Sequence, residues 1–272
     1  MRNPQEYYNA NSRGYVQKWD LSQEGLKRPR NYYRLKIIES LIKLASIKQG
    51  DRVIEVGCGT GLVLREVLKL IRPVYGTDIS SEMLQRVKDS VLKDKKVSIV
   101  NDLSEPNPGS DVLLAQDDLF KSKLPQKFFD KVLSMEVLRY NDDLPKCLNN
   151  VHDAMKDGGI FVFTVTNLFS FGLFPVKYNL RKLFNKIDRS RELVQYFVTE
   201  RSIKKELAEA DFSIIAFEKT GLLAANKFVG RFVHTAEGAE KIIKLSRKLS
   251  KLPVINQLSD TFIIAVTANP AK

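Results

Sequence analysis

Apolar residues follow two patterns along this chain, and from residue 51 onward the two patterns alternate. Short continuous apolar runs predict buried strands, whereas apolar positions that recur every three or four residues predict amphipathic helices. Strands that alternate with helices are typical of a parallel sheet covered on both faces, so we expect a doubly wound α/β fold. The expected strands are Val53–Val56, Val74–Thr77, Val112–Ala115, Lys131–Met135, Ile160–Val165, Ser213–Phe217 and Thr261–Thr267, and the expected helices between them are Leu62–Leu70, Ser81–Leu92, Leu144–Met155 and Glu200–Ala210.

Two helix boundaries carry local signals. Ser80-Ser81-Glu82 combines an N-cap residue with early negative charge, which favours a helix start at this point. Another helix is expected to end near Lys156, where Asp157-Gly158-Gly159 follows. Residues 89–111 contain two prolines and a glycine near their end, so they are expected to be less regular.

Three segments lie outside this alternation. Residues 1–50 are expected to form a basic, helical cap, in which aromatic side chains are interleaved with arginines and lysines. The main domain is expected over residues 51–272, with inserted lid segments at about 167–198 and 224–258. Within the second insertion, Ile242–Lys251 predicts a short basic amphipathic helix.

Length and charge bound the class of protein. The 272 residues suffice for one enlarged domain or a domain with a lid, and we expect the second. The net charge of +12 fits an acidic partner such as RNA, an anionic membrane or a phosphorylated metabolite, and equally fits a basic surface that only aids solubility. No apolar run approaches the roughly 18 residues of a spanning helix, so a cytoplasmic protein without an integral membrane segment is expected.

The cysteine and histidine content argues against a metal site. Cys58 and Cys147 are the two cysteines, and two cysteines with two histidines are too few for a zinc site. We therefore expect reduced thiols and no metal.

The segment Glu55-Val56-Gly57-Cys58-Gly59-Thr60-Gly61 joins an expected strand to an expected helix through a glycine turn. Glycine is needed there because a side chain would block both the turn and the close approach of a ligand to the backbone. The dinucleotide fingerprint G-x-G-x-x-G does not fit, since its third glycine would fall on Leu62. Glu55 would face a pyrophosphate poorly and a cationic aminoacyl group well, so spacing and charge disfavour a nicotinamide dinucleotide.

Asp78 ends the second expected strand, where a carboxylate can accept hydrogen bonds from a ribose diol. Alone it could equally be an N-cap, but the glycine loop makes the pair a strong signal. Glu55–Gly61 and Asp78, followed by Asp117-Asp118, Phe129-Asp130-Lys131-Val132 and Lys156-Asp157-Gly158-Gly159, resemble the ordered motifs of class I S-adenosylmethionine-dependent methyltransferases that act on small molecules. The resemblance spans about residues 50–166.

The resemblance implies a fold, a cofactor and a set of contacts. It implies a seven-stranded, mostly parallel sheet with an antiparallel last strand, and S-adenosyl-L-methionine as cofactor. It also implies that Glu55 lies near the methionine amino group and that Asp78 binds the ribose hydroxyls. The other implied contacts are Gly57, Cys58, Gly59 and Gly61 beneath the cofactor, Ile79 against adenine, Asp117 or Asp118 near the adenine amino group, and Ser134 beside the methionyl part.

The acceptor is expected beyond the carboxyl ends of the strands, between the loop after Met135 and the aromatic insertion after Thr166. The protein must mainly align the two substrates and remove a proton, because the sulfonium methyl is already activated. Glu136 and Tyr140 are the candidate catalytic residues, with Arg139 beside them, although each could equally be a packing residue.

The loop also narrows the acceptor class. Ser134-Met135-Glu136-Val137 lacks the proline pair of amino-nucleobase methyltransferases, and no Pro-Cys pair supplies a thiolate for cytosine-carbon methylation. We therefore expect transfer to an oxygen or nitrogen of a small, partly apolar metabolite or lipid-like acceptor. The alternatives are an RNA methyltransferase and a membrane-surface lipid methyltransferase, each of which would use the basic surface.

Two further expectations concern the tyrosines and histidines. Tyr7, Tyr8 and Tyr15 are expected to fold over the cofactor as a lid that excludes water. His152 is expected to be a packing or surface residue of its helix, whereas His234, in the basic insertion, is a weaker candidate for substrate contact.

Overall fold

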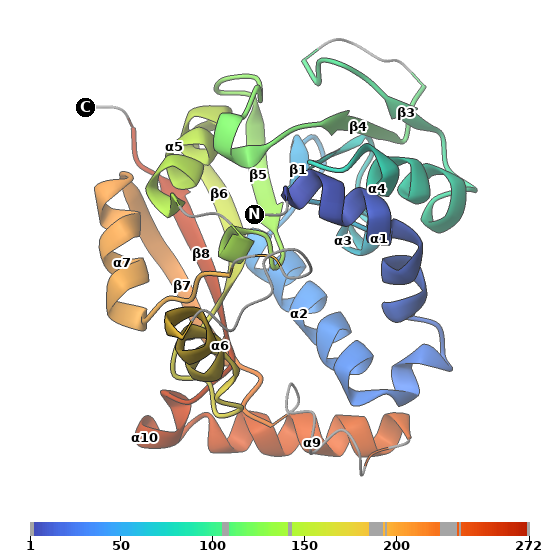
Figure 1. Ribbon diagram of the computed structural model, residues 1–272. Helices are drawn as coiled ribbons and strands as arrows, with labels where there is room; N and C mark the ends of the chain where they lie inside the picture. The colour runs from blue at the N-terminus through green and yellow to red at the C-terminus, as the bar shows by residue number, and fades with distance from the viewer. Residues whose placement is uncertain are drawn as a thin grey trace.

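A single mixed sheet forms the centre of the protein (Figure 1). The computed structural model describes residues 3–104, 109–140, 143–184, 193, 195–223, 233 and 235–270. The described strands lie in the order β3-β4-β2-β1-β5-β6-β8-β7, and β8 alone runs in the direction opposite to the other strands. They are β1 Val53–Val56, β2 Val74–Asp78, β3 Val97–Ile99, β4 Val112–Gln116, β5 Phe129–Ser134, β6 Met155–Thr166, β7 Phe212–Thr220 and β8 Thr261–Ala268.

The doubly wound fold with an antiparallel last strand is confirmed, but the expected number of strands is one too few. The additional strand, β3, pairs in parallel with β4 at the edge of the sheet. It has three residues, of which only Val97 is buried, so it leaves no apolar run in the sequence. Edge strands of this length are therefore easily missed by hydrophobic patterning.

Helices cover both faces of the sheet (Figure 1). α2 and α3 pack on one face and α5 and α7 on the other, and side chains of the strands alternate between the two cores. In β1, for example, Val53 belongs to the first core and Ile54 to the second. The helices are α1 Pro4–Lys18, α2 Pro29–Ala45, α3 Leu62–Val67, α4 Ser81–Arg86, α5 Leu144–Ala154, α6 Phe174–Leu183, α7 Glu200–Glu209, α9 Ala236–Leu249 and α10 Pro253–Asn256, with shorter helical turns η1 Gly25–Lys27, η2 Val87–Val91, η3 Leu119–Lys121 and η4 Leu138–Tyr140.

Local capping explains where two of these helices begin and end. The Ser80 hydroxyl accepts a hydrogen bond from the backbone N–H of Met83 at 3.1 Å, which caps α4 as predicted. α5 ends at Ala154, two residues before the predicted end, because β6 already begins at Met155. Gly158 then takes a left-handed backbone conformation within that strand, with φ of +71°.

The N-terminal segment forms two helices with different surroundings. α2 belongs to the main core, where Ile38 and Leu41 are completely buried. α1 instead lies beside α4, near the carboxyl end of β2, and Asn9 Oδ1 accepts a hydrogen bond from Ser80 Oγ at 2.6 Å. α1 is thereby held close to the edge of the sheet that carries the glycine loop (Figure 1).

The basic amphipathic helix is longer than predicted and lies against α2. Residues Ala236–Leu249 form α9, and Ala239 and Ile243 on its apolar side are buried. Part of the apolar side of this helix therefore packs inside the protein, while Leu245 is 46% exposed. None of the described helices is both long and apolar enough to cross a membrane.

Candidate active site

The loop between β1 and α3 is held by backbone contacts to β2. The N–H of Cys58 donates to the carbonyl of Thr77 at 2.7 Å, and the N–H of Gly59 donates to Asp78 Oδ2 at 2.8 Å. Gly57, Gly59 and Gly61 all have left-handed backbone conformations, with φ of +71°, +51° and +71°. Glycine is the residue that adopts these angles without strain, so the local sequence dictates the shape of the turn.

The three glycines differ in what surrounds them. A Cβ atom at Gly57 would lie 2.2 Å from Val137 Cγ2, and one at Gly61 would lie 2.9 Å from Val87 Cγ1. A Cβ at Gly59 would meet nothing within 4 Å. The outer glycines therefore allow close packing within the protein, whereas Gly59 leaves an open space beside the backbone.

Two buried carboxyl groups flank this loop. Glu55 is 3% exposed, and its Oε2 accepts a hydrogen bond from the N–H of Leu64 at 3.2 Å. Burial, assisted by the nearby charge of Asp78, raises the pKa of Glu55 well above its usual range. Burial also raises the pKa of Asp78 to about 6, against the opposing effect of the N–H groups of Ser80 and Gly59. Both groups are ready to be stabilised as carboxylates by a bound cation or by hydroxyl donors.

The paired aspartates after β4 differ in their hydrogen bonds. Both oxygens of Asp117 are engaged, because Oδ2 accepts from Ser122 Oγ at 2.9 Å and Oδ1 accepts from the N–H of Lys123 at 2.9 Å. Asp118 Oδ1 caps the following turn by accepting from the N–H of Phe120 at 3.1 Å. Asp117 thus shapes the loop with both oxygens, and Asp118 does so with one.

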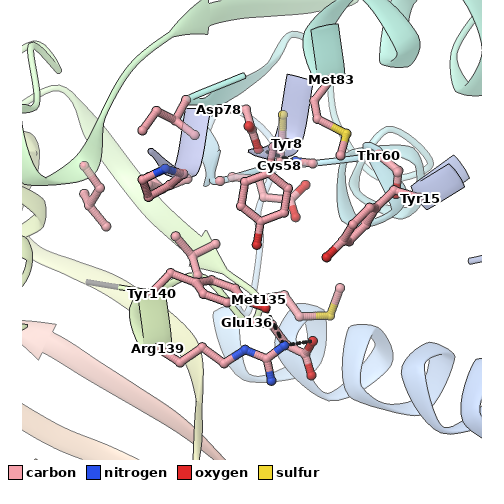
Figure 2. A pocket seen from close by; sticks show the side chains of 18 of the residues that line it. Tyr8, Tyr15, Cys58, Thr60, Asp78, Met83, Met135, Glu136, Arg139 and Tyr140 are labelled. Atoms are coloured by element: carbon pink, nitrogen blue, oxygen red, sulfur yellow. Dashed lines mark hydrogen bonds and ion pairs between the residues drawn. The ribbon is translucent and has the colours of Figure 1, made fainter. Parts of the chain in front are cut away.

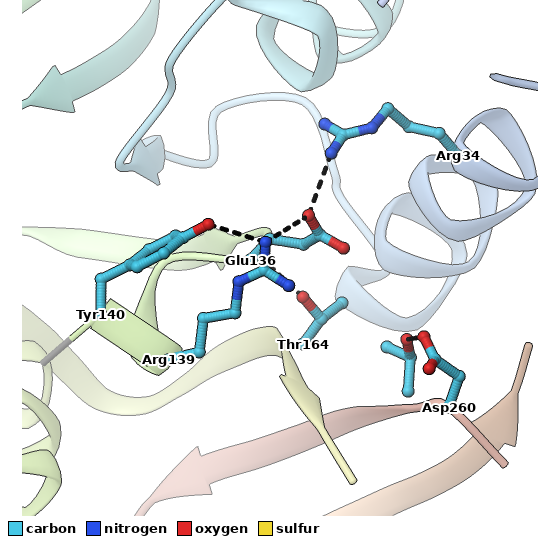
Figure 3. A network of polar contacts seen from close by, with 7 residues as sticks. Arg34, Glu136, Arg139, Tyr140, Thr164 and Asp260 are labelled. Atoms are coloured by element: carbon cyan, nitrogen blue, oxygen red, sulfur yellow. Dashed lines mark hydrogen bonds and ion pairs between the residues drawn. The ribbon is translucent and has the colours of Figure 1, made fainter. Parts of the chain in front are cut away.

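The loop after β5 carries the predicted catalytic residues. Glu136 has a φ of +62°, which is unusual for a residue with a side chain, and its N–H donates to Thr164 Oγ1 at 2.8 Å. Its Oε2 lies 3.1 Å from Arg34 Nη2 and 3.5 Å from Arg139 Nη2, and Arg139 also donates to the Tyr140 hydroxyl at 2.7 Å (Figure 3). Glu136 is therefore the centre of an ion-pair network.

The charges of that network determine the protonation of Glu136. Burial alone would raise its pKa, but the guanidinium groups of Arg139, Arg34 and Arg30 and the ammonium of Lys18 together lower the pKa to about 2. Glu136 is therefore ionised at neutral pH and is a weak base.

The N-terminal helices supply a wall that faces the glycine loop. The ring of Tyr8 makes edge contacts with those of Tyr15 and Tyr140, at centroid distances of 5.6 and 5.9 Å. Burial raises the pKa of Tyr8, and it raises that of Tyr15 to about 12. Both tyrosines are neutral at physiological pH, so this wall is aromatic and uncharged.

These elements enclose one cavity of about 450 Å³, which is within the usual range for a small-molecule site. Figure 2 shows Asp78, Cys58 and Thr60 on one side of it, with Tyr8, Tyr15 and Tyr140 around it and Glu136 and Arg139 on the other side. The predicted residues that line it are Glu55, Gly57, Cys58, Gly59, Asp78, Ile79, Asp117, Asp118, Glu136 and Tyr140.

Two predicted residues are placed behind the lining. Gly61 is at the start of α3, facing Val87, and the Ser134 hydroxyl donates to the carbonyl of Val56 at 3.1 Å. Ser134 is 1% exposed and links β5 to β1. Neither is among the residues that line the cavity.

Sequence reasoning missed a second group of lining residues, which come from the end of α1 and from α2. Their signal was the interleaving of aromatic and basic residues in the first 50 positions, which did not reveal the side facing the cavity. The missed residues are Lys18, Trp19, Arg30 and Arg34.

His152 is not among the residues that line the cavity. His152 lies on α5, where Nε2 is 3.2 Å from the carbonyl oxygen of Asn269 and the ring makes an edge contact with Phe212. His234 lies outside the described residues, as do parts of both insertions. Tyr7 contacts Tyr8 edge to face and is not itself among the lining residues.

The fold and this site together define a class I S-adenosylmethionine-dependent methyltransferase, which is the class that the sequence predicted. Residues 30–216 match a family model described as a methyltransferase domain. Because the match covers more than half of the chain, the chain belongs to this methyltransferase family. Its cofactor is S-adenosylmethionine, and the open space beside Gly59 and the buried carboxyl groups of Glu55 and Asp78 fit that molecule.

Relatives of known sequence agree with this family. The chain is 29% identical over 221 residues to an uncharacterised protein of Methanocaldococcus jannaschii, with 79% of this chain and 78% of that protein covered. It is 27% identical over 157 residues to a ubiquinone biosynthesis O-methyltransferase of Xanthomonas euvesicatoria pv. vesicatoria, with 55% and 56% covered. The match thus spans little more than half the length of this second relative.

Solved structures share the fold. A magnesium protoporphyrin IX methyltransferase from Synechocystis with bound S-adenosylhomocysteine superposes with a TM-score of 0.62 at 15% identity, covering 97% of this chain and 98% of that one. A structure titled as a complex of the Haloferax volcanii Trm112 methyltransferase activator and a methyltransferase gives a TM-score of 0.63 at 15% identity, with 99% of both chains covered. At this identity the likeness concerns the fold alone.

Proposed function

We propose that the chain transfers the methyl group of S-adenosylmethionine to an oxygen or nitrogen atom of a small, partly apolar acceptor. The observation that carries this proposal is the cavity in which the glycine loop faces an aromatic wall of Tyr8, Tyr15 and Tyr140. Aromatic side chains around a cavity of this size favour a compact ligand with apolar surface. A named relative that methylates oxygen in ubiquinone biosynthesis agrees with such an acceptor.

The cofactor would lie along the carboxyl ends of β1, β2 and β4. In this proposal Glu55 binds the methionine ammonium group and Asp78 the two ribose hydroxyls. Ile79 packs on the adenine. Asp118 is assigned to its amino group, because Asp118 makes one hydrogen bond within the loop whereas Asp117 makes two. Gly57, Cys58 and Gly59 supply the surface beneath the cofactor, while Gly61 and Ser134 act from behind by holding α3 and β5 in place.

The chemistry requires alignment more than acid–base strength. Bound S-adenosylmethionine supplies a methyl carbon that an acceptor lone pair attacks in line, with the sulfur keeping the electron pair of the broken carbon–sulfur bond. Tyr140, whose hydroxyl accepts a hydrogen bond from Arg139, is the proposed contact to the acceptor. Glu136 is a positioning residue rather than the base, because its pKa of about 2 leaves it a poor proton acceptor. A nitrogen acceptor attacks as the neutral amine, and the proton of the hydroxyl or amine acceptor passes to solvent.

The lipid and RNA alternatives receive less support from the described residues. Ala239 and Ile243 of α9 are buried, so of its apolar side chains Leu245, which is 46% exposed, would be available to a membrane together with its basic residues. No described feature favours RNA beyond net charge. A cytoplasmic location and the division into a cap and a main domain stay predictions.

Calorimetry tests the proposed cofactor contacts directly. We expect micromolar binding of S-adenosylmethionine to the wild-type protein, which corresponds to roughly −8 kcal/mol, and loss of this binding in Asp78→Ala. Asp94→Ala is the matched control, because Asp94 is an exposed aspartate that pairs with Lys95. Equal affinity of both variants would refute the assignment of Asp78.

A further inference from the structure

One side of the cavity collects positive charge around a single tryptophan. The guanidinium carbons of Arg34 and Arg30 lie 3.7 and 4.7 Å from the ring centroid of Trp19, and Lys18 Nζ lies 4.9 Å from it. Arg139 adds a fourth cation from the loop after β5. We call Lys18, Arg30, Arg34 and Arg139 the cationic rim; all four, and Trp19, line the cavity.

The rim is only partly neutralised. Glu136 pairs with Arg34 and Arg139, but no described carboxylate lies within ion-pair distance of Lys18 or Arg30. With four cations and this one paired carboxylate, the rim keeps a net charge of +3. Among the described residues, the buried donors Arg139 Nε and Trp19 Nε1 also lack a hydrogen-bond partner. Buried donors without a partner are rare in folded proteins, and both residues line the cavity.

Repulsion between the positive charges of the rim also favours an anionic ligand. Burial lowers the pKa of Lys18, and the positive charges of Arg30 and Arg34 lower it further. Burial likewise lowers the pKa of Arg34, whose side chain is 14% exposed, although Glu136 opposes that shift. An anion placed between these groups would remove the unfavourable interaction.

S-adenosylmethionine does not neutralise the positive charge of the cationic rim. S-adenosylmethionine carries a sulfonium, an ammonium and a carboxylate at neutral pH, and so adds one positive charge to the cavity. Its carboxylate could engage one member of the rim and would still leave the others without a counter-charge. A second substrate with a negative charge would supply a counter-charge at the rim itself.

We propose that the acceptor is an anion, whose carboxylate or phosphate group binds the cationic rim beside Trp19 while its apolar part packs against the tyrosine wall. This inference rests on the proposed methyl transfer and specifies the substrate class of the same site. Arg30 and Lys18 are the residues that determine the specificity for charge, since Arg34 and Arg139 are already paired with Glu136. Arginine is suited to this task because its guanidinium can bind two oxygens at once.

Trp19 reports on this site directly, because it is the only tryptophan of the chain. The protein, saturated with S-adenosylhomocysteine, would be titrated with hexanoate and with hexyl phosphate while its intrinsic fluorescence is recorded. We expect a saturable change with both anions, loss of the change as salt is added, and no change with hexanol. A response to hexanol equal to that of the anions would overturn the proposal.

Variants assign the response to the rim. In Lys18→Gln/Arg30→Gln we expect the anion affinity to fall at least tenfold, while in Glu136→Gln it should rise because the competing carboxylate is removed. Lys43→Gln is the matched control, since it removes a cation from the same helix α2 outside the cavity lining.

Calorimetry with S-adenosylhomocysteine separates the two sources of an anionic group. If the double variant loses cofactor affinity and retains anion affinity, the rim serves the cofactor carboxylate, and the inference fails while the proposed function stands. If the wild-type protein binds no cofactor, the proposed function itself fails. Unchanged cofactor affinity with weakened anion binding is the expected result.

Discussion

The three glycines of the cofactor loop can be distinguished by adding one methyl group to each. In Gly59→Ala the new Cβ meets no protein atom within 4 Å, so the fold is expected to lose only the strain of a left-handed alanine. That strain is about 1–2 kcal/mol, and the lower entropy of the unfolded alanine chain offsets part of it, which leaves a net loss of about 1 kcal/mol. In Gly57→Ala the Cβ would lie 2.2 Å from Val137 Cγ2, and the clash should add about 1–3 kcal/mol.

Cofactor affinity, in contrast to stability, is expected to be sensitive to the change at Gly59. Gly59→Ala fills the space that the loop leaves for the ligand, and should weaken binding of S-adenosylmethionine at least tenfold, or about 1.4 kcal/mol. Gly50→Ala is the matched control: Gly50 also has a left-handed φ of +87° with nothing within 4 Å, but it lies outside the cavity lining. Denaturant unfolding measures stability and calorimetry measures affinity. If Gly59→Ala and Gly50→Ala bind the cofactor equally well, the space beside Gly59 is not the cofactor site.

Three further predictions concern the same cavity. Affinity for S-adenosylmethionine, measured by calorimetry, should increase from about pH 5 to about pH 7, because the pKa of Asp78 is raised to about 6 and its carboxylate is the better acceptor for two hydroxyls. That pKa lies above the usual value of 3.8, so the stability contributed by the protonated group is present at low pH and is lost as the pH rises through about 6. Chemical denaturation of the ligand-free protein should show this decline. Asn9→Ala removes the hydrogen bond to Ser80 and should speed release of S-adenosylhomocysteine about fivefold in stopped-flow measurements, with unchanged release counting against a lid. Tyr140→Phe should lower kcat about tenfold with little change in cofactor affinity once an acceptor is found, and a loss confined to cofactor binding would contradict its assignment to the acceptor side.

The cofactor half of the site was predictable because its requirements are local. A glycine loop after a buried strand, with acidic residues at fixed distances, needs neighbouring residues and one adjacent strand, and these are legible in a linear sequence. Of the predicted cofactor residues, Gly61 and Ser134 lie behind the lining. Residue spacing in the sequence does not show whether a side chain faces the cavity or a neighbouring strand, so their positions could not be predicted. Strand β3 could not be predicted either, because three residues with one buried side chain show no periodicity.

The acceptor half depends on long-range packing. Arg30 and Arg34 reach the cavity because α2 packs on the sheet and turns its first half toward the loop after β5, and Trp19 at the end of α1 lies against both guanidinium groups. The low pKa of Glu136 depends on Arg139, three residues further along, and also on Arg34, Arg30 and Lys18, which are distant in the chain. The sequence around Met135 could not disclose this second contribution. The interleaved aromatic and basic residues of the first 50 positions were visible in the sequence. Which of them face the cavity was not.

The packing of α9 against α2 connects the second insertion to the cavity. α2 presents Arg30 and Arg34 to the cavity from its first half, while Ile37, Ile38 and Leu41 belong to the same buried core as Ile243 of α9. α9, which belongs to the insertion after β7, therefore braces the helix that carries Arg30 and Arg34. A change in α9 would reach the cavity through these two cations of α2.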